Sequence, residues 1–480
     1  MRVLLVRPPA STFNVSPPIG LGYLATALRR AGHEASVLDC TKSELTLEGF
    51  RQFLKTDSAY DICGFQTYSC EVDQVNRCLQ IVRETIPHAV RIIGGAHPSG
   101  SPDCLDAIPE ADFAFLGEGE TSLAQFCNAL SSSTTPIWQS VPGLLWRENG
   151  TIRNTARYAE PNLDNLGFPA WDLIDPSTYP AAPHGGFARR FPAAPLIISR
   201  GCPYSCTFCG TKNVTGMKMR YRSPQHVIEE IRMLQRDYGV REIHVEDDNF
   251  SAVRREVKKF CEAMIQEGVD IPWYCTSGLR LDLIDAEIAG LMRKAGCYTA
   301  TIAIESASQR TLNHMKKNLN LARVPEHIRI LREAGFDLNA LFILGYPTET
   351  REDIEETIRY AMKLDVQRAQ FSNFLPIPGT EAYEYVKSRG EIDDLDQSQL
   401  HTADIPYSPP GITRSQLKWL QRKAFLRFHL RPRILWTTLR SIQSFSHFRY
   451  LARRVLDYVF VRRKVKYASP SRLDATQVTG

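Results

Sequence analysis

Short apolar runs alternate with amphipathic stretches over the first 130 residues. The runs have strand length: VLLV at 3–6, ASVLD at 35–39, DICGFQT at 61–67, RIIGG at 91–95 and FAFLGEGE at 113–120. Between the first two runs, apolar residues recur at helical spacing, namely Leu21, Leu24, Ala25 and Leu28, and Gly32 follows as a cap. This alternation predicts an α/β fold, a doubly wound (Rossmann-like) parallel sheet over residues 1–145. Three aromatic residues are expected in its core: Tyr23, Phe65 and Phe115.

Four loops that follow these strands are rich in Gly, Pro and other small residues. They read RPPASTFNVSPPIG at 7–20, QTYSCE at 66–71, GGAHPSG at 94–100 and GEGE at 117–120. Ligands of doubly wound sheets bind at the carboxyl ends of the strands, and small residues let the backbone approach a ligand closely. We therefore expect a ligand site on these loops. Asp39, at another strand end, fits either a helix cap or a ligand contact.

The alternation stops over residues 146–193, where Pro, Asp and aromatic residues follow one another without a period. We interpret this segment as an ordered connector whose aromatic residues pack against one of the domains.

A second alternating series follows over residues 194–385. Its strand-like runs are PLIIS at 195–199, EIHVE at 242–246, WYCTS at 273–277, TATIAIE at 299–305, LNALFIL at 338–344 and RAQFSNF at 368–374. Amphipathic stretches of helical length separate these runs. Six consecutive strand–helix units predict a partial (β/α)6 barrel with its active groups at the carboxyl ends of the strands.

Residues 386–480 form a basic region, expected to be mostly helical from about Gln416 to Lys466. Between 411 and 470, fifteen Lys and Arg residues accompany the single acid Asp457, whereas the whole chain carries a net charge of +5. Apolar residues are interleaved with the basic ones: Trp419, Leu420, Phe425, Phe428, Leu435 and Leu439. The favoured interpretation is a helix packed on the barrel with its basic groups in solvent. Contact with an anionic substrate or a membrane surface is the alternative.

Length and cysteine usage indicate a cytoplasmic protein of two domains. The opening residues, MRVLLVRPPA, contain an apolar run too short for a signal peptide, and no later stretch reaches ~20 apolar residues without charges. Most of the twelve cysteines occur singly within apolar patterns, as buried thiols in a reducing compartment do.

Three cysteines are the exception, because Cys202, Cys206 and Cys209 lie within eight residues, directly after the first strand of the second series. Three thiolates can ligate three irons of a cubane cluster and leave the fourth iron open. A zinc site would require a fourth ligand at comparable spacing. His184 and His244 are the candidates, but neither lies in a paired ligand motif, so zinc is disfavoured.

The Cys-x3-Cys-x2-Cys spacing, with Phe208 before the last cysteine, resembles the signature of the radical S-adenosylmethionine (SAM) superfamily. The resemblance covers roughly residues 195–380. It implies that a 4Fe-4S cluster binds SAM through its open iron and cleaves it to methionine and a 5'-deoxyadenosyl radical. It also implies an electron donor such as flavodoxin or ferredoxin.

Later strand ends resemble the SAM-binding motifs of the same superfamily. EDDNF at 246–250 stands where the family contacts the SAM amino group, which implies roles for Asp247 and Asp248, although acids replace the usual Gly-Gly-Glu. Arg280 is the implied partner of the SAM carboxylate.

The ribose and adenine of SAM also have implied sites. Glu305 and Ser306 resemble the ribose-binding end of the fourth strand, where a carboxylate can accept hydrogen bonds from both hydroxyls. GYPTET, beginning at Gly345, and PIPGTE at 376–381 resemble the motifs that frame adenine. Each acid taken alone also fits a solvated loop charge or a helix cap.

The order of the domains resembles the cobalamin-binding radical SAM enzymes. Matching phrases include PPIGLGYLATALRRAGHEASVLD, IIGGAHPSG and FLGEGETSL. The implied cobalamin contacts lie on the small-residue loops: Pro9, Gly20, Thr67, Tyr68, Gly94, Gly95, His97, Gly117 and Glu118. The Asp-x-His-x-x-Gly motif that supplies cobalt with a histidine in cobalamin mutases is absent. His97 is therefore expected at the nucleotide tail, or in a hydrogen bond within its own loop, rather than on cobalt.

This resemblance implies a methyltransferase that acts on an unactivated carbon of a small-molecule or lipid-like substrate. The family also contains methyltransferases acting on phosphorus, an anaerobic cyclase and a ring-contracting enzyme, so a cyclase, an oxidoreductase or a rearrangement enzyme is the alternative. A non-catalytic maturation or docking role with a structural cluster is disfavoured by the SAM-like motifs at later strand ends. No nucleic-acid partner is expected.

Overall fold

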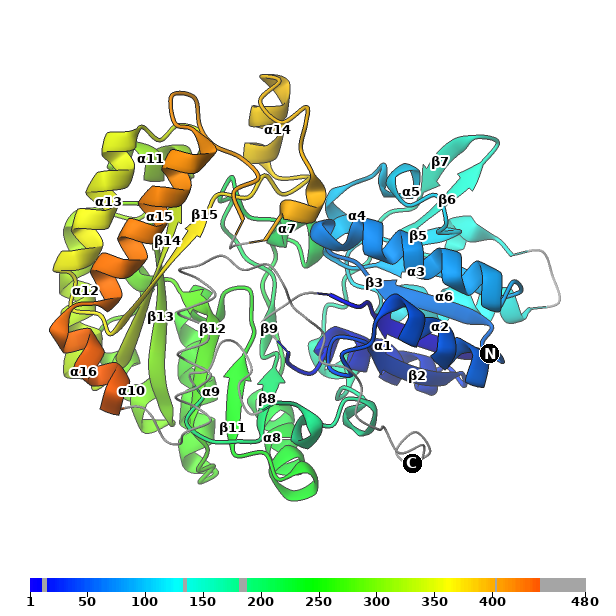
Figure 1. Ribbon diagram of the computed structural model, residues 1–480. Coiled ribbons are helices and arrows are strands. Elements are labelled where there is room, and N and C mark those ends of the chain that lie inside the picture. The colour runs from blue at the N-terminus through cyan, green and yellow to red at the C-terminus, as the bar shows by residue number, and fades with distance from the viewer. Residues whose placement is uncertain (11–14, 133–135, 181–187, 402–403, 441–480) are drawn as a thin grey trace.

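The computed structural model describes residues 1–10, 15–132, 136–180, 188–401 and 404–440. Two α/β units lie side by side, the first drawn in blue to cyan and the second in green to orange (Figure 1). This arrangement confirms the predicted fold class.

The first unit contains a seven-stranded sheet of order β2-β1-β3-β4-β5-β6-β7. The strands are β1 (Arg2–Arg7), β2 (Glu34–Asp39), β3 (Ile62–Gln66), β4 (Val90–Gly94), β5 (Phe113–Phe115), β6 (Leu144–Glu148) and β7 (Thr151–Asn154). The first five run parallel, and β6 and β7 form an antiparallel hairpin at the edge. The connector therefore does not begin at residue 146, which lies inside β6. Asn149 and Gly150 both have positive φ at the hairpin turn.

Helices cover both faces of this sheet. Helices α1 (Ile19–Arg30) and α6 (Glu120–Ser131) pack on one face, and α2 (Leu47–Thr56) and α3 (Val72–Thr85) pack on the other. Three of the four residues predicted at helical spacing in α1 are buried: Leu21, Ala25 and Leu28. The three predicted core aromatics, Tyr23, Phe65 and Phe115, are buried as well. Shorter helical turns occupy the loops: η1 (Ser69–Glu71), α4 (Ala96–Gly100), α5 (Cys104–Ala107) and η2 (Trp138–Ser140).

The described part of the connector contains three 3-10 turns: η3 (Leu163–Leu166), η4 (Trp171–Leu173) and η5 (Pro176–Thr178). It contacts both units. The indole of Trp171 is buried and donates to Glu230 of the second unit at 2.8 Å. On the other side, a Cβ at Gly22 in α1 would lie 2.7 Å from Ile174, so the connector packs closely on that helix.

The second unit is a six-stranded parallel sheet whose order follows the sequence, β8-β11-β12-β13-β14-β15. The strands are β8 (Ala193–Leu196), β11 (Glu242–Val245), β12 (Trp273–Leu279), β13 (Cys297–Glu305), β14 (Asp337–Leu344) and β15 (Arg368–Asn373). A two-residue antiparallel ribbon joins β9 (Ser199–Arg200) to β10 (Arg220–Tyr221). The predicted partial barrel of six strands is confirmed.

Helices surround this barrel (Figure 1). They are α7 (Thr211–Val214), α8 (Pro224–Tyr238), α9 (Arg254–Gln266), α10 (Ala286–Lys294), α11 (Gln309–His314), α12 (Val324–Glu333), α13 (Arg351–Lys363) and α14 (Glu381–Ser388). Local sequence sets their ends. In α8, the Ser223 side chain accepts from the His226 amide, Pro224 takes the first helical position, and Gly239 adopts the left-handed conformation after the last turn.

Two helices represent the basic region: α15 (Arg414–His429) and α16 (Pro432–Arg440). The apolar face of α15 packs on β15 and α13 through Leu417, Leu420, Ala424 and Phe428, while Trp419 is 53% exposed. Gln421 of α15 donates to the backbone carbonyl of Phe371 in β15 at 2.9 Å. The predicted helix beyond residue 440 and the side chain of Leu439 lie outside the described residues. Within the described chain, no helix combines the length and apolar character needed to cross a bilayer.

Candidate active site

The three clustered cysteines lie on a hairpin loop at the carboxyl end of the barrel. The β9–β10 ribbon closes the base of this loop, which spans residues 201–219. A Cβ at Gly201 would lie 2.4 Å from the Lys218 carbonyl oxygen, so only glycine fits immediately before Cys202. The amide of Cys202 donates to Gly216 O at 3.1 Å. We call residues 199–221 the cysteine hairpin.

All three thiols are partly exposed. Burial raises the pKa of Cys206, and the nearby charges of Lys317 and Arg280 oppose that shift. The Asn249 amide donates to Cys202 Sγ at 3.6 Å, and Cys209 Sγ donates to Thr211 Oγ1 at 3.3 Å. Iron requires the thiolate form, and the two basic groups beside Cys206 partly offset the effect of burial on its thiol.

Among the described residues, no group of three or more His, Cys, Asp or Glu side chains could hold a single metal ion. His244, one of the two histidines considered for zinc, is buried against Glu242 at 3.1 Å; His184 lies outside the described residues. A cubane places each thiolate on a different iron, so its ligands need not converge on one ion. The donor set of three thiolates on one loop fits a 4Fe-4S cluster.

Asp247 supports the start of the cysteine hairpin through hydrogen bonds. It is buried and accepts from the Ile198 amide at 2.7 Å, and from the amide and hydroxyl of Ser199 at 2.9 and 2.6 Å. Burial raises its pKa to about 7, although these three donors oppose the shift. Asp247 thus fixes the backbone that leads into the cysteine hairpin, and its predicted contact with the SAM amino group stays a prediction.

Asp248 has a similar position. It accepts from the Gly201 amide at 3.1 Å, from Thr215 Oγ1 at 2.6 Å and from Thr211 Oγ1 at 3.3 Å. Both neighbouring acids therefore brace the loop that carries the cysteines. The predicted contact of Asp248 with SAM stays a prediction.

Two cations lie beside the cysteine hairpin, and only one was predicted. Arg280 is stacked 3.9 Å over the Tyr204 ring and donates to Asp282 at 2.9 Å. Lys317, which the sequence interpretation missed, donates to Glu305 at 2.8 Å. Burial opposes its charge, but Glu305 more than offsets this, so the pKa of Lys317 lies above its usual range. Both cations thus lie near the thiolates, where an anionic group of a ligand would be attracted.

The ends of β13 and β14 are joined through a buried carboxylate. Glu349 accepts from the Ser306 hydroxyl at 3.1 Å and from the amides of Gly345 and Tyr346 at 2.8 and 3.1 Å. Burial raises the pKa of Glu349 to about 8. Tyr346 in turn hydrogen-bonds through its hydroxyl to Thr207 at 2.8 Å, next to Cys206. Glu305, which precedes Ser306, has a φ of 70°, a strained conformation for a non-glycine residue.

Phe208, predicted by the signature, is partly buried and packs against the barrel core. It anchors the cysteine hairpin between Cys206 and Cys209.

The loops after β3 and β4 form the candidate cobalamin side. Gly95 has a φ of 106°, and a Cβ there would lie 3.2 Å from Thr67 O. Thr67 is fully buried, and its amide donates to Gly94 O at 2.8 Å, whereas Tyr68 is 47% exposed. These loops therefore combine tightly packed backbone with an exposed aromatic ring.

His97 bridges two of these loops. Its Nδ1 lies 3.0 Å from Ser69 Oγ, and its Nε2 is buried without a hydrogen-bond partner. Burial lowers its pKa to about 4, so the ring is neutral at physiological pH. An unsatisfied buried ring nitrogen between small-residue loops fits a site whose polar ligand completes the hydrogen bonding.

The remaining predicted cobalamin residues differ in their surroundings. Pro9 is buried, whereas Gly20 is exposed in α1 with open space around the position of a Cβ. The amide of Gly117 donates to Ser99 Oγ at 2.9 Å. Glu118 is buried and pairs with Arg220 and Arg200 of the cysteine hairpin. The structure thus gives Glu118 a role that the sequence did not indicate.

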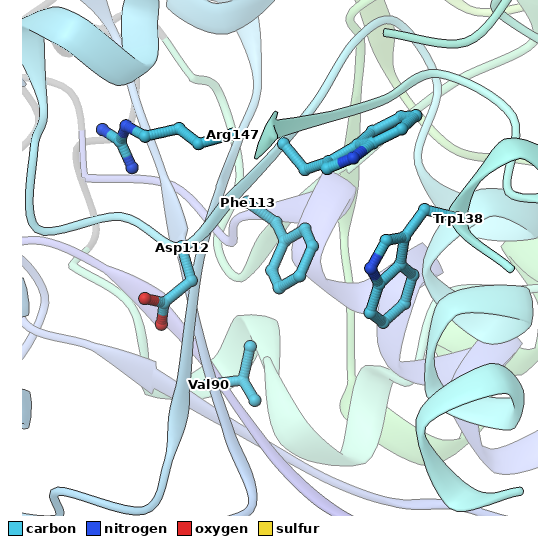
Figure 2. Close-up of a pocket in the computed structure, with 6 residues that line it drawn as sticks. Val90, Asp112, Phe113, Trp138 and Arg147 are labelled. Carbon is cyan, nitrogen blue, oxygen red and sulfur yellow. The ribbon is translucent and has the colours of Figure 1, made fainter. Parts of the chain in front are cut away.

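A hollow of about 390 Å³ lies at the opposite end of the first sheet (Figure 2). It is lined by Val90, Asp112, Phe113, Trp138, Trp146 and Arg147. Its charged groups are already paired within the protein, since Asp112 accepts from Arg91 and Arg147 donates to Ala111 O. Because it lies at the amino ends of β4 and β5, it is separate from the predicted site.

Two family models match the chain. The model described as the radical SAM superfamily matches residues 196–361, and the model described as a B12 binding domain matches residues 10–126. These ranges contain the cysteine hairpin and the small-residue loops, respectively.

Several relatives match over most of the chain. "Uncharacterized methyltransferase PH0819" of Pyrococcus horikoshii is 30% identical over 95% of this chain and 97% of its own length. Cytidylyl-2-hydroxyethylphosphonate methyltransferase of Streptomyces wedmorensis is 30% identical over 82% of this chain and 83% of its own. The anaerobic magnesium-protoporphyrin IX monomethyl ester cyclase of Cereibacter sphaeroides is 27% identical over 90% of this chain and 71% of its own.

A solved structure shares the fold. OxsB, described as a cobalamin-dependent S-adenosylmethionine radical enzyme with aqua-cobalamin and S-adenosylmethionine bound, superposes with a TM-score of 0.72. It is 16% identical, and the match covers 98% of this chain and 73% of that one.

Proposed function

This chain belongs to the cobalamin-dependent radical SAM methyltransferase family, and on that premise we propose that it methylates an unactivated sp3 carbon of a small-molecule or lipid-like substrate. Its cofactors are a 4Fe-4S cluster, SAM and cobalamin. The observation that carries the proposal is the attachment of the cobalamin-side loops to the cysteine hairpin: Glu118 pairs directly with Arg220, and Arg157 donates to the carbonyl oxygens of both Ser99 and Asn213. A methyl carrier and a radical generator held this close suit a carbon that has no nucleophilic electron pair.

The proposed division of labour follows from the residues. Cys202, Cys206 and Cys209 would hold three irons, and the loops around Thr67 and Gly95 would hold cobalamin. When bound, the cluster supplies the 5'-deoxyadenosyl radical that removes a substrate hydrogen, and cobalamin supplies the methyl group. The protein's own contribution is to align these groups and to keep solvent from quenching the radical.

Lys317 and Arg280 are the proposed partners of anionic groups on SAM. Both lie close enough to Cys206 for their charges to lower the pKa of its thiol against the effect of burial. Each cation already has a carboxylate partner, Asp282 for Arg280 and Glu305 for Lys317, and Lys317 is the candidate that the structure adds to the predicted set.

Cyclisation or rearrangement with the same cofactors is the second candidate, favoured by the 27% identity to the anaerobic cyclase. The two reactions differ in the fate of SAM. Methylation consumes one SAM as methyl donor and a second as radical source, whereas cyclisation needs only the radical source. A low-potential donor such as flavodoxin or ferredoxin would supply the electron in either case.

The deciding experiment uses SAM with a deuterated methyl group in anaerobic reactions with extracts of the producing organism. We expect a product heavier by the labelled methyl, with S-adenosylhomocysteine and 5'-deoxyadenosine formed in equal amounts. Deoxyadenosine without S-adenosylhomocysteine, together with an unlabelled product, would establish the cyclase or rearrangement reaction instead.

A further inference from the structure

The base of the cysteine hairpin places two arginines side by side. In the β9–β10 ribbon, Arg200 lies opposite Arg220, two residues before Cys202. Because the ribbon is only two residues long, its own ladder gives the loop little rigidity. The orientation of the cysteines therefore depends on side-chain contacts of the cysteine hairpin, among them those of these two arginines.

Both arginines are held by the GEGE loop of the other domain. Arg220 makes a bidentate pair with Glu118, one bond measuring 2.9 Å. Arg200 pairs with Glu118 at 3.3 Å and donates to Glu120 at 2.7 Å. All four side chains are buried, with less than a tenth of each exposed.

The charges in this cluster balance one another. Burial alone would raise the pKa of Glu120, but Arg200 more than offsets it, so the pKa lies below its usual range. Arg200 also stacks over the Tyr23 ring at 5.1 Å. Removal of one partner from such a buried network leaves a guanidinium without its counter-charge, which is costly.

A second fastening lies on the far side of the cysteine hairpin. Asn213, four residues after Cys209, donates to Gly379 O at 2.8 Å and accepts from Arg157. Arg157 also donates to Ser99 O at 2.7 Å. A Cβ at Gly100 would lie 2.4 Å from Pro378 O, so the backbones of the two domains touch here.

We propose that Glu118 and Glu120 are positioning residues that fix the cysteine hairpin, and with it the cluster, at a set distance from the cobalamin domain. In this role the GEGE loop of the first domain holds the cysteine hairpin through Arg200 and Arg220, rather than contacting cobalamin. The proposal deepens the proposed function, since it rests on transfer between two cofactors in different domains.

The first test is magnetic and needs no substrate. The full chain is reconstituted with the cluster and hydroxocobalamin, and pulsed electron paramagnetic resonance measures how the reduced cluster speeds the relaxation of cob(II)alamin. We expect Glu118→Gln to weaken and broaden this coupling, because the cluster no longer has one fixed distance to cobalt. Coupling identical to that of the wild type would overturn the proposal.

The second test follows the two fates of SAM with titanium(III) citrate as reductant. S-adenosylhomocysteine remains when the methyl cation leaves SAM for the electron pair of reduced cobalt, and 5'-deoxyadenosine reports reductive cleavage at the cluster. We expect Glu118→Gln to lower the ratio of S-adenosylhomocysteine to 5'-deoxyadenosine by about tenfold or more, since a misplacement of about one ångström can cost up to about a hundredfold in rate. Equal losses of both products would indicate a merely structural role.

Glu230→Gln is the matched control. Glu230 is a buried carboxylate paired with Arg222, like Glu118 with Arg220, but it joins the barrel to the connector. Glu230→Gln should lower stability while leaving the ratio of S-adenosylhomocysteine to 5'-deoxyadenosine and the magnetic coupling unchanged. If Glu118→Gln does not fold, Arg220→Lys keeps the charge, loses the bidentate geometry and should show the same changes more weakly. If the wild type itself forms no S-adenosylhomocysteine, methyl transfer fails as a function, and the magnetic arm still decides the positioning role.

Discussion

The carboxyl ends of the two sheets are built in different ways. At the barrel end, three carboxylates are hydrogen-bonded by the chain: Asp247 and Asp248 hold the cysteine hairpin, and Glu349 holds the turn after β14. At the end of the first sheet, Tyr68 is exposed and Nε2 of His97 has no hydrogen-bond partner. The absence of a side chain at Gly95 lets the loop after β4 pack closely on Thr67. The barrel end is thus braced by hydrogen bonds within the chain, whereas the end of the first sheet leaves a buried ring nitrogen open to a ligand.

The largest expected effect separates the two ends completely. Replacement of Cys202, Cys206 and Cys209 by Ala should remove the iron and the cluster absorbance, because no other thiol of the described chain lies on this loop. Cobalamin binding should persist, since its loops belong to the other sheet. Iron analysis and absorbance spectra of anaerobically reconstituted protein measure both. Cys70→Ala, on the cobalamin side, is the control and should retain iron; a full iron complement in the triple variant would refute the assignment.

The reciprocal change is Gly95→Ala. Strain of about 1–3 kcal/mol is expected for a side chain at a φ of 106°, and the added Cβ presses on Thr67 O. Cobalamin affinity should fall about tenfold while iron content stays the same. Titration with hydroxocobalamin measures this. Gly32→Ala carries the same kind of strain, with a φ of 82° and open space around it, so it should cost stability but not affinity. Equal losses of cobalamin affinity in both variants would contradict the assignment of cobalamin to the loops around Gly95.

A smaller effect concerns Glu71, which lies in the loop after β3 and accepts from the Tyr68 amide at 3.2 Å. Burial raises its pKa from 4.5 to about 7, so the folded chain holds the proton more tightly than the unfolded chain does. Its stabilising contribution is present below about pH 4.5 and is lost as the pH rises through about 7. Relative to the wild type, Glu71→Gln should therefore gain on the order of 1 kcal/mol across this window. Urea unfolding of the cofactor-free protein at several pH values measures it, and parallel curves would argue against the raised pKa.

The smallest expected effect is an unchanged cob(II)alamin spectrum after replacement of His97. The cob(II)alamin spectrum should lack nitrogen superhyperfine splitting from a histidine, because His97 Nε2 is buried and the loop after β1 contains no histidine. His97→Asn should leave the electron paramagnetic resonance spectrum unchanged and only weaken retention of cobalamin. A three-line splitting that disappears in this variant would place His97 on cobalt.

Much of the fold could be predicted because strand and helix periods are local. The order of the barrel strands follows the sequence, as consecutive strand–helix units require. The β6–β7 hairpin was missed, although its Asn149-Gly150 turn is a strong signal for a two-residue hairpin loop. The predicted boundary at residue 146 instead divides β6, leaving Leu144 and Leu145 in the first domain and placing the rest of the hairpin in the connector.

The site was predictable where chemistry depends on residue type and spacing, and not where it depends on partners distant in sequence. The three cysteines could be identified as candidate cluster ligands from their spacing alone. A carboxylate such as Asp247 does not reveal whether it will bind a ligand or the backbone of Ile198 and Ser199, some fifty residues away. Glu118 and Arg220 are 102 residues apart and belong to different domains, so no local pattern could have paired them.

Helix α15 has a consequence that lies outside catalysis. A parallel barrel of six strands does not close on itself, so β15 is an edge strand whose outward carbonyls could template pairing with another chain. Gln421 takes up one of these carbonyls, at Phe371, and the apolar face of α15 covers the strand beside it. Helix α15 therefore shields the edge strand from aggregation. A chain shortened before residue 414 would expose the edge of β15 to pairing with other chains.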